Sequence, residues 1–303
     1  GVRHERVLVV EPVHELIESE SGDSAFVMKL IQGRAWSELF DDKVSFDEHI
    51  GIMLNVCNAI EYAHDKGLAH LDLKPDNVMV GAFGEVLVMD WGLAVDIRET
   101  PSYAGVAVHK SQVDAPCGTP CYIAPELAMG WGDQIGTWTD VYLLGAVLYE
   151  VLTGKPLHPG ETVEAALDHS VSGKVPEFDG GVAEALQQIC RQAVAHSPLE
   201  RTQTVSAFRE ALESYLDHRE SLVLTHNAHA VLTQIRAARG QGGAAQQERY
   251  TGLNDALASF RQAVLLWEGN TEARLGEIQT QEAFAEEALA SGDLGVARAH
   301  AAA

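Results

Sequence analysis

The sequence predicts an α+β protein, with a short strand-rich segment first, a mostly helical body after it and an all-α region at its C-terminus. Residues 7–16 and 25–31 are rich in β-branched residues, as strands are. Residues 46–66 and the run from Asp140 instead carry helical patterns, and residues 218–303 are rich in Ala, Gln, Leu and Glu. With 303 residues, 46% of them hydrophobic and 21% charged, the chain has room for one large domain and a smaller one.

The charge of the chain excludes some partners. Its formal net charge is −23, from 21 Lys and Arg against 44 Asp and Glu. Such a surface repels phosphate backbones and anionic lipid headgroups, so we expect no nucleic-acid partner. No apolar run reaches the roughly 18 residues of a membrane span. Four cysteines without the spacing of a zinc site predict free thiols in a cytoplasmic protein: Cys57, Cys117, Cys121 and Cys190.

The first strands enclose a turn. Residues 7–16 predict one or two strands, with Pro12 as a break. Ser19 to Asp23 predicts the turn, and residues 25–31 predict a strand that ends at Gln32-Gly33. On these residues alone, the pair is an ordinary hairpin.

The body begins with a helix from Phe46 to Lys66, where apolar residues recur every three or four positions and Gly67 follows as a stop. Residues 78–80 and 86–89 predict two short strands around a glycine-containing turn. Residues 90–126 are rich in Ser, Thr, Gly and Pro, which predicts a long loop, and long loops inside a domain are usually functional.

The second half of the body is helical. From Asp140 the chain is apolar nearly all round, which predicts a buried helix that ends at residues 153–156. Amphipathic helices are predicted over residues 162–169, 182–195 and 205–217. The helical body therefore extends to about residue 217.

Residues 70–77, His-Leu-Asp-Leu-Lys-Pro-Asp-Asn, place an acid, a lysine and an amide close together. The segment Asp90-Trp91-Gly92 begins 18 residues after Asp72, and Ala124-Pro125-Glu126 follows. In this order, the three motifs resemble the catalytic loop, the magnesium-binding segment and the Ala-Pro-Glu segment of eukaryotic-type (bacterial) Ser/Thr protein kinases. The resemblance covers residues 7–217 and implies a kinase-like fold, with strands four and five of a β small lobe followed by a helical large lobe.

The resemblance implies transfer of the ATP γ-phosphate to Ser and Thr hydroxyls of a protein substrate. Asp72 would accept the hydroxyl proton, and Lys74, followed by Pro as in Ser/Thr-specific members, would neutralise the phosphate. Asn77 and Asp90 would hold Mg²⁺, which prefers oxygen ligands. Thr119 would tether the substrate-binding loop to Asp72 and Lys74.

The same resemblance assigns binding and structural roles. The adenine pocket would consist of a back, a hinge and an apolar floor: Met28 at the back, Lys29, Leu30 and Ile31 in the hinge, and Met79 as the floor. Asp140 would brace the backbone of the catalytic loop. Glu126 and Arg201 would form an ion pair that stabilises the large lobe without a part in catalysis.

The chain departs from the family at several places. Leu71 replaces an Arg that normally pairs with a phosphorylated loop, and Trp91 replaces a Phe. The glycine-rich loop, strand-three lysine and helix glutamate would lie before residue 7, and the chain starts at Gly1 rather than Met, so we expect a fragment of an active kinase. The alternative, an inactive pseudokinase or scaffold that binds a partner through its helical tail, stays open.

The C-terminal region carries a possible repeat. Ala256, Phe260 and Ala263 have the spacing of the second helix of a tetratricopeptide repeat, after a glycine-rich break at residues 240–243. The offset from Ala256 to Ala297 is 41 residues rather than the ~34 of that repeat. A plain helical extension is therefore equally consistent. The predicted division is a small-lobe remnant at 1–32, a large lobe at 33–217 and a helical tail at 218–303.

Overall fold

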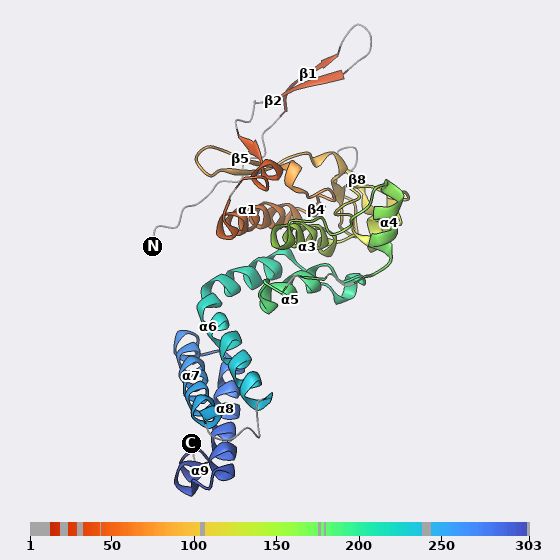
Figure 1. The fold of residues 1–303 in the computed structure, drawn as a ribbon. Coiled ribbons are helices and arrows are strands. Elements are labelled where there is room, and N and C mark those ends of the chain that lie inside the picture. The colour runs from red at the N-terminus through yellow and green to blue at the C-terminus, as the bar shows by residue number, and fades with distance from the viewer. Residues whose placement is uncertain are drawn as a thin grey trace. The chain divides into compact units, whose positions relative to one another are not determined.

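The computed structural model of the chain describes residues 13–18, 24–28, 33–42, 44–103, 107–174, 177–178, 180–237 and 244–301. The chain divides into two compact units, Gly1–Glu213 and Ser214–Ala303 (Figure 1). Within the described residues, all strands belong to the first unit, and the second unit consists mainly of helices. This arrangement confirms the predicted α+β class.

The first two strands form an antiparallel hairpin. β1 (Val13–Glu18) pairs with β2 (Ser24–Met28), with Val13 opposite Met28. The predicted strands over 7–16 and 25–31 are thus confirmed where the structure describes them. Residues 7–12, the predicted turn at 19–23 and residues 29–31 lie outside the described residues.

Helix α1 (Phe46–Asp65) is the predicted helix of the body. The Ser45 hydroxyl accepts the Glu48 N–H while the Glu48 carboxylate accepts the Ser45 N–H, a reciprocal cap that satisfies two free donors. Gly67 ends the helix at a φ of 80°, which favours glycine. The buried face consists of apolar side chains: Ile50, Met53, Cys57 and Ile60.

Helix α3 (Thr137–Thr153) is the predicted buried helix and begins three residues before Asp140. It packs against α1 and against α5 (Glu184–Ala193). A Cβ atom at Gly145 would lie 2.7 Å from the Ala193 Cβ, so only glycine permits this approach of α3 to α5. The first unit therefore has its core around α3.

Short strands hold the loops between these helices. β5 (Val78–Val80) pairs antiparallel with β6 (Val86–Val88) and with β3 (Arg34–Ala35). β7 (Val95–Asp96) pairs with β4 (Leu68–Ala69) and, in parallel, with β8 (Val108–His109). The predicted strands at 78–80 and 86–89 are therefore confirmed. Between Asp90 and α2 (Pro125–Ala128), the described residues otherwise form single turns and irregular backbone, as the loop prediction requires.

The later helices confirm two predictions and correct a third. α4 (Val163–Val171) and α5 match the helices predicted at 162–169 and 182–195. The helix predicted to end at Asp217 is α6 (Val205–Ala237), which continues for 20 more residues. The predicted end was wrong because residues 218–237 contain no Gly or Pro to stop a helix. The boundary between the two units lies within α6.

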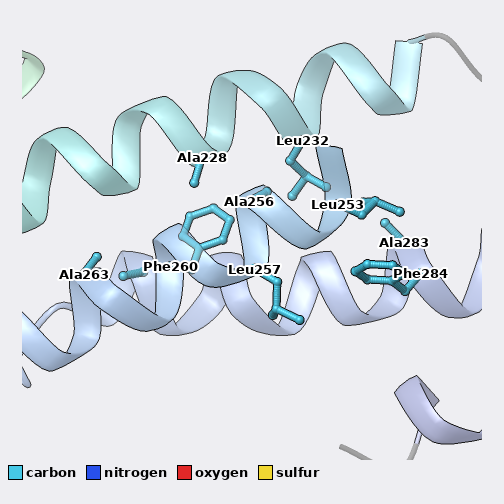
Figure 2. Packing of buried hydrophobic residues seen from close by; sticks show 10 residues of the cluster. Ala228, Leu232, Leu253, Ala256, Leu257, Phe260, Ala263, Ala283 and Phe284 are labelled. Atoms are coloured by element: carbon cyan, nitrogen blue, oxygen red, sulfur yellow. The ribbon is translucent and has the colours of Figure 1, made fainter. Parts of the chain in front are cut away.

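The second unit is a set of packed helices. α7 (Ala244–Leu266), α8 (Thr271–Ala290) and α9 (Leu294–Ala301) follow the end of α6. Figure 2 shows Phe260 of α7 in the middle of the apolar contact between α6, α7 and α8. Ala256, Phe260 and Ala263 are all buried there. Their assignment to a tetratricopeptide repeat stays a prediction.

Two remaining sequence features can be compared with the structure. All four cysteines are free, as predicted. Among the described helices, none combines the length and apolar character needed to cross a lipid bilayer.

Candidate active site

A buried carboxylate fixes the backbone of the loop that follows β4. Asp140 of α3 is fully buried, and its Oδ2 accepts the His70 N–H at 2.8 Å while its Oδ1 accepts the Leu71 N–H at 2.9 Å. The Nε2 atom of His64, in the last turn of α1, lies 2.7 Å from Oδ2. α1 and α3 thus hold the start of the loop from one side.

The same contacts determine the charge on Asp140. Burial alone would raise the pKa of this carboxyl group, but the hydrogen bond and charge of His64, together with His70, lower it below its usual value. Asp140 is therefore ionised at neutral pH, and its negative charge orients the two backbone N–H groups.

Leu71 marks the turn in the loop. Its φ is 66°, a left-handed conformation that branched side chains rarely adopt, and its side chain is fully buried. Such a conformation costs about 1–3 kcal/mol and persists only where its surroundings determine it. Here the N–H bond to Asp140 and the buried side chain hold Leu71 in place, and Asp72 follows directly.

His70 connects the loop to the segment before Asp90. Its Nδ1 accepts the Asp72 N–H at 3.2 Å, and its Nε2 lies 2.9 Å from the Met89 carbonyl oxygen. A carbonyl oxygen can only accept, so the ring proton is on Nε2. The Trp91 ring packs edge-on against His70, with centroids 4.7 Å apart. Trp91 thus packs against the side chain that starts the loop.

The predicted base lies in a hydrogen-bonded cluster of Asp72, Lys74, Asn77 and Thr119, the Asp72 cluster. The Thr119 hydroxyl donates to Asp72 Oδ1 at 2.6 Å and accepts from the Lys74 ammonium at 2.6 Å. That ammonium also lies 3.1 Å from Asp72 Oδ2. The Asn77 amide donates to the Asp72 carbonyl at 2.8 Å and to Oδ2 at 3.1 Å. The structure therefore brings Thr119 next to Lys74 and Asp72, which lie 45 and 47 positions earlier in the sequence.

The backbone pairing of the β5–β6 hairpin brings the backbone of Asp90 beside this cluster. Beyond the β5–β6 pair, the Met89 N–H donates to the Asn77 carbonyl at 2.8 Å, which places the backbone of Asp90 next to that of Asn77. Asp90 has a φ of 58°, is exposed, and accepts the Gly92 N–H with Oδ1 at 3.3 Å. The backbone positions that carry this carboxylate and the Asn77 amide are therefore neighbours at the end of the hairpin.

These donors fit a magnesium ion. The side-chain amide nitrogen of Asn77 donates to Asp72. The side-chain oxygen of Asn77, Oδ1, is therefore the atom that faces away from these bonds and can bind a cation. Asp90 adds a solvent-exposed carboxylate. Mg²⁺ is typically bound by one or two such side chains together with waters and phosphates, so the pair has the right chemistry.

The predicted adenine pocket is only partly described. Met79 is a half-buried residue of β5, opposite Ala35 and Leu87 on the neighbouring strands. Met28 is the last residue of β2. The hinge residues Lys29, Leu30 and Ile31 lie outside the described residues.

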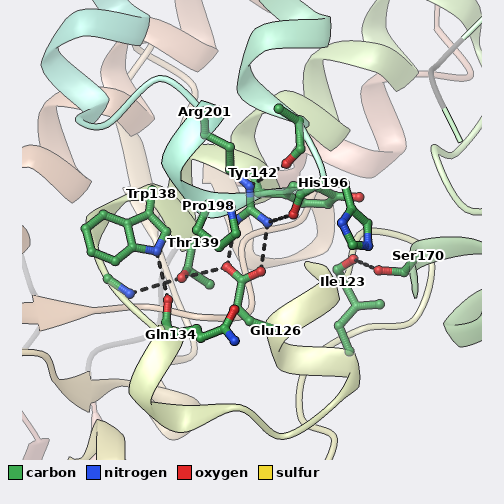
Figure 3. A network of polar contacts seen from close by, with 12 residues as sticks. Ile123, Glu126, Gln134, Trp138, Thr139, Tyr142, Ser170, His196, Pro198 and Arg201 are labelled. Atoms are coloured by element: carbon green, nitrogen blue, oxygen red, sulfur yellow. Dashed lines mark hydrogen bonds and ion pairs between the residues drawn. The ribbon is translucent and has the colours of Figure 1, made fainter. Parts of the chain in front are cut away.

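Glu126 and Arg201 form a two-fold ion pair inside the first unit (Figure 3). The Arg201 guanidinium donates to the two Glu126 oxygens at 2.6 and 2.8 Å, and both side chains are fully buried. The Thr139 hydroxyl donates to Glu126 at 2.9 Å. Arg201 also donates to the Ala195 and His196 carbonyls. The pair therefore connects α2, α3 and the segment before α6.

Two further groups were missed by the sequence analysis. His64 lies within the predicted helix, but only the apolar positions of that helix were considered. Asp96 is 1% exposed and accepts two bonds at 2.9 Å from Arg98 and one at 2.8 Å from the Ser102 N–H. The Arg98 bonds, with those of the backbone, overcome burial and lower the pKa of Asp96. The spacing of Asp96 two residues before Arg98 is the sequence signal that could have indicated this ion pair.

A family model described as "Protein kinase domain" matches residues 4–214. The chain is 31% identical to the serine/threonine-protein kinase PknD of Chlamydia trachomatis over 219 residues, 63% of this chain and 22% of that protein. It is 31% identical to PknB of Mycobacterium leprae over 217 residues, 70% and 33% of the two chains. It is 29% identical to a probable serine/threonine-protein kinase PknB of Bifidobacterium longum over 242 residues, 77% and 34%. The chain thus spans 22–34% of the length of these relatives.

Proposed function

The chain belongs to the protein kinase domain family, and from this premise we propose that it transfers the γ-phosphate of ATP to Ser and Thr hydroxyls of protein substrates. The observation that supports the proposal most is the Asp72 cluster. A carboxylate, an ammonium and a hydroxyl within 2.6–3.1 Å of one another combine a proton acceptor, a cation and a positioning group. Phosphoryl transfer requires these parts and little covalent chemistry from the protein.

In the proposed reaction, Asp72 accepts the proton of the substrate hydroxyl as its oxygen attacks the γ-phosphorus. The new O–P bond forms while the bond to the β–γ bridging oxygen breaks, and ADP leaves with that electron pair. Lys74 supplies positive charge next to the transferred group. Thr119 and Asn77 keep the Asp72 carboxylate oriented through their bonds to its two oxygens.

Members of this family generally use ATP and Mg²⁺, and we propose both for this chain. The Asp90 carboxylate and the side-chain oxygen of Asn77 would hold the ion, whose charge offsets that of the phosphates. Met28, Lys29, Leu30 and Ile31 would line the adenine side, with Met79 beneath the ring. Asp140 would fix the backbone of the loop that carries Asp72, and the Glu126–Arg201 pair would stabilise the large lobe.

The test compares phosphate transfer by the product of the gene's full reading frame with transfer by its Asp72→Asn variant. We expect the variant to lose about 10²–10⁴-fold in kcat on a Ser/Thr peptide, because the proton acceptor is removed. The matched control is Asp76→Asn, an exposed acid in the same loop, which should keep most of the activity. No transfer by the parent, with Asp72→Asn behaving like it, would contradict the proposal and favour an inactive scaffold.

We further propose that the helical region at 218–303 binds a protein partner. Residues 1–32 would form the remnant of the small lobe, and residues 33–217 the large lobe. We also propose that the protein acts in the cytoplasm. The free thiols support a reducing compartment. No side chain of the Asp72 cluster comes from the second unit. Deletion of residues 244–303 should therefore leave ATP binding unchanged while abolishing capture of a protein partner.

A further inference from the structure

Two buried side chains, those of Ser170 and His158, form hydrogen bonds to the backbone of the segment just after Thr119. The carbonyl oxygen of Ile123 accepts the Ser170 hydroxyl at 2.8 Å, drawn in Figure 3, and it lies 3.0 Å from Nε2 of His158. The backbone N–H of His158 donates to the Cys121 carbonyl at 3.1 Å. Both Ser170 and His158 are buried, so these bonds are shielded from water.

His158 is itself fixed by its neighbours. Its Nδ1 lies 3.0 Å from Nδ1 of His169, and its Nε2 lies 3.0 Å from the Tyr142 hydroxyl. The Ile123 carbonyl only accepts, so His158 carries its proton on Nε2. The lone pair on Nδ1 then accepts the Nδ1–H of His169. His158 thus serves as donor at one nitrogen and acceptor at the other, which requires its neutral form.

The surroundings favour that neutral form. Burial, and then the nearby His169, lower the pKa of His158 to about 4, against a smaller opposing effect of the Ile123 bond. The pKa of His169 is lowered by its own burial and by Lys174. His158 is therefore neutral over the neutral range of pH, and its Nδ1 remains an acceptor for His169.

The held segment leads directly to the catalytic cluster. The Tyr122 N–H donates to the Thr119 carbonyl at 3.0 Å, which closes a tight turn over Thr119–Tyr122, directly before Ile123. The Thr119 hydroxyl in turn touches Asp72 and Lys74. A shift of the Ile123 carbonyl would therefore change the position of the Thr119 hydroxyl on Asp72.

We infer that His158 and Ser170 are positioning residues of this protein: by holding the Ile123 carbonyl they set the shape of residues 119–123 for binding a peptide substrate. The inference rests on the proposed phosphate transfer, which supplies the substrate. It assigns no contact with the reacting atoms to either residue. Their effect reaches the reaction through Thr119.

The experiment uses the product of the full reading frame and four variants. His158→Phe and Ser170→Ala each remove one donor to Ile123, so we expect kcat/KM for a Ser/Thr peptide to fall about three- to tenfold, with KM for ATP unchanged. In His158→Gln the amide nitrogen can replace Nε2, so most of the loss should be recovered. The matched control is Ser172→Ala, whose hydroxyl donates to the His169 carbonyl near the end of the same helix rather than to Ile123.

Amide hydrogen exchange gives a readout that needs no activity. Residues 119–123 should exchange faster in His158→Phe and Ser170→Ala than in the parent, in His158→Gln and in Ser172→Ala, while α3 keeps its protection. If the parent transfers no phosphate, the proposed function fails, but this exchange pattern still tests the bonds to Ile123. Unchanged exchange and unchanged kcat/KM in His158→Phe and Ser170→Ala would overturn the inference.

Discussion

Nε2 of His64 lies 2.7 Å from Oδ2 of Asp140, and the two side chains are 8% and 0% exposed. This contact links the last turn of α1 to the first turns of α3, and it completes the set of donors around the Asp140 carboxylate. The other donors are the backbone N–H groups of His70 and Leu71, at the start of the loop that carries Asp72. The position of Asp72 therefore depends on the packing of α1 against α3.

His64→Leu should destabilise the first unit by about 1–3 kcal/mol, because a buried carboxylate loses one of its partners. Urea unfolding at pH 7 measures the change. The lowered pKa of Asp140 adds a pH dependence. A carboxyl group with a depressed folded pKa contributes stability above its unfolded pKa of about 4, and this contribution is lost as the pH falls through the folded value.

The parent should therefore lose stability below about pH 4 more steeply than the His64→Leu variant. The exposed Asp133 provides a matched acid control. Asp133→Asn should stay within about 0.5 kcal/mol of the parent, as surface substitutions usually do. If His64→Leu behaves like Asp133→Asn, the His64 contact contributes nothing to stability.

The sequence predicts local elements well because their causes are local. α1 has its apolar spacing, its Ser45 cap and its Gly67 stop within one stretch of chain. α6 shows the limit of such reasoning. Its amphipathic pattern predicts a helix that ends at Asp217, although no helix-breaking residue follows before the helix ends at Ala237.

Contacts between distant residues could be predicted only through the family resemblance. The resemblance placed Thr119 next to Asp72, and the structure brings the two together, although the assigned roles stay predictions. Asp140 and His64 are 76 residues apart, and nothing in either local sequence points to the other. The same holds for His158 and Ile123, because the hydrogen bonds of a buried histidine depend on tertiary packing.

Arg201→Met should destabilise the first unit by about 3–5 kcal/mol, because it leaves the Glu126 charge buried without its cation. The double variant Glu126→Gln with Arg201→Met removes that charge and should recover part of the loss. A double-mutant cycle by urea unfolding gives the coupling energy. For comparison, the exposed pair of Arg34 with Glu38 should contribute less than about 1 kcal/mol. Additive effects at Glu126 and Arg201 would refute the coupling.

Stability should also fall on the acid side of neutrality because of His158. Its folded pKa of about 4 lies below the value of about 6.5 expected in the unfolded chain, so between these values the unfolded state binds more protons. This contribution to stability is complete above about pH 6.5 and decreases as the pH falls towards 4. The slope reaches at most about 1.4 kcal/mol per pH unit.

His158→Gln removes this titration. The free energy of unfolding should therefore depend less on pH between 6.5 and 4 in the variant than in the parent. His49 and His169 also have lowered pKa values, so the variant keeps a smaller slope and the comparison depends on the difference. Parallel curves for parent and variant would show that His158 is not held neutral.

Two glycines in helices should respond in opposite ways to alanine. Gly51 in α1 has open space where a Cβ atom would lie, so Gly51→Ala should stabilise the protein by about 0.5–1 kcal/mol through helix propensity. At Gly276 in α8, a Cβ atom would overlap the ring of Phe260, which is fully buried in the core of the second unit. The ring cannot move without disturbing that core, so Gly276→Ala should destabilise the second unit by about 1–3 kcal/mol despite the same gain in propensity. Thermal unfolding followed by circular dichroism distinguishes the two effects, and a stabilised Gly276→Ala would mean that α7 and α8 pack less closely than described.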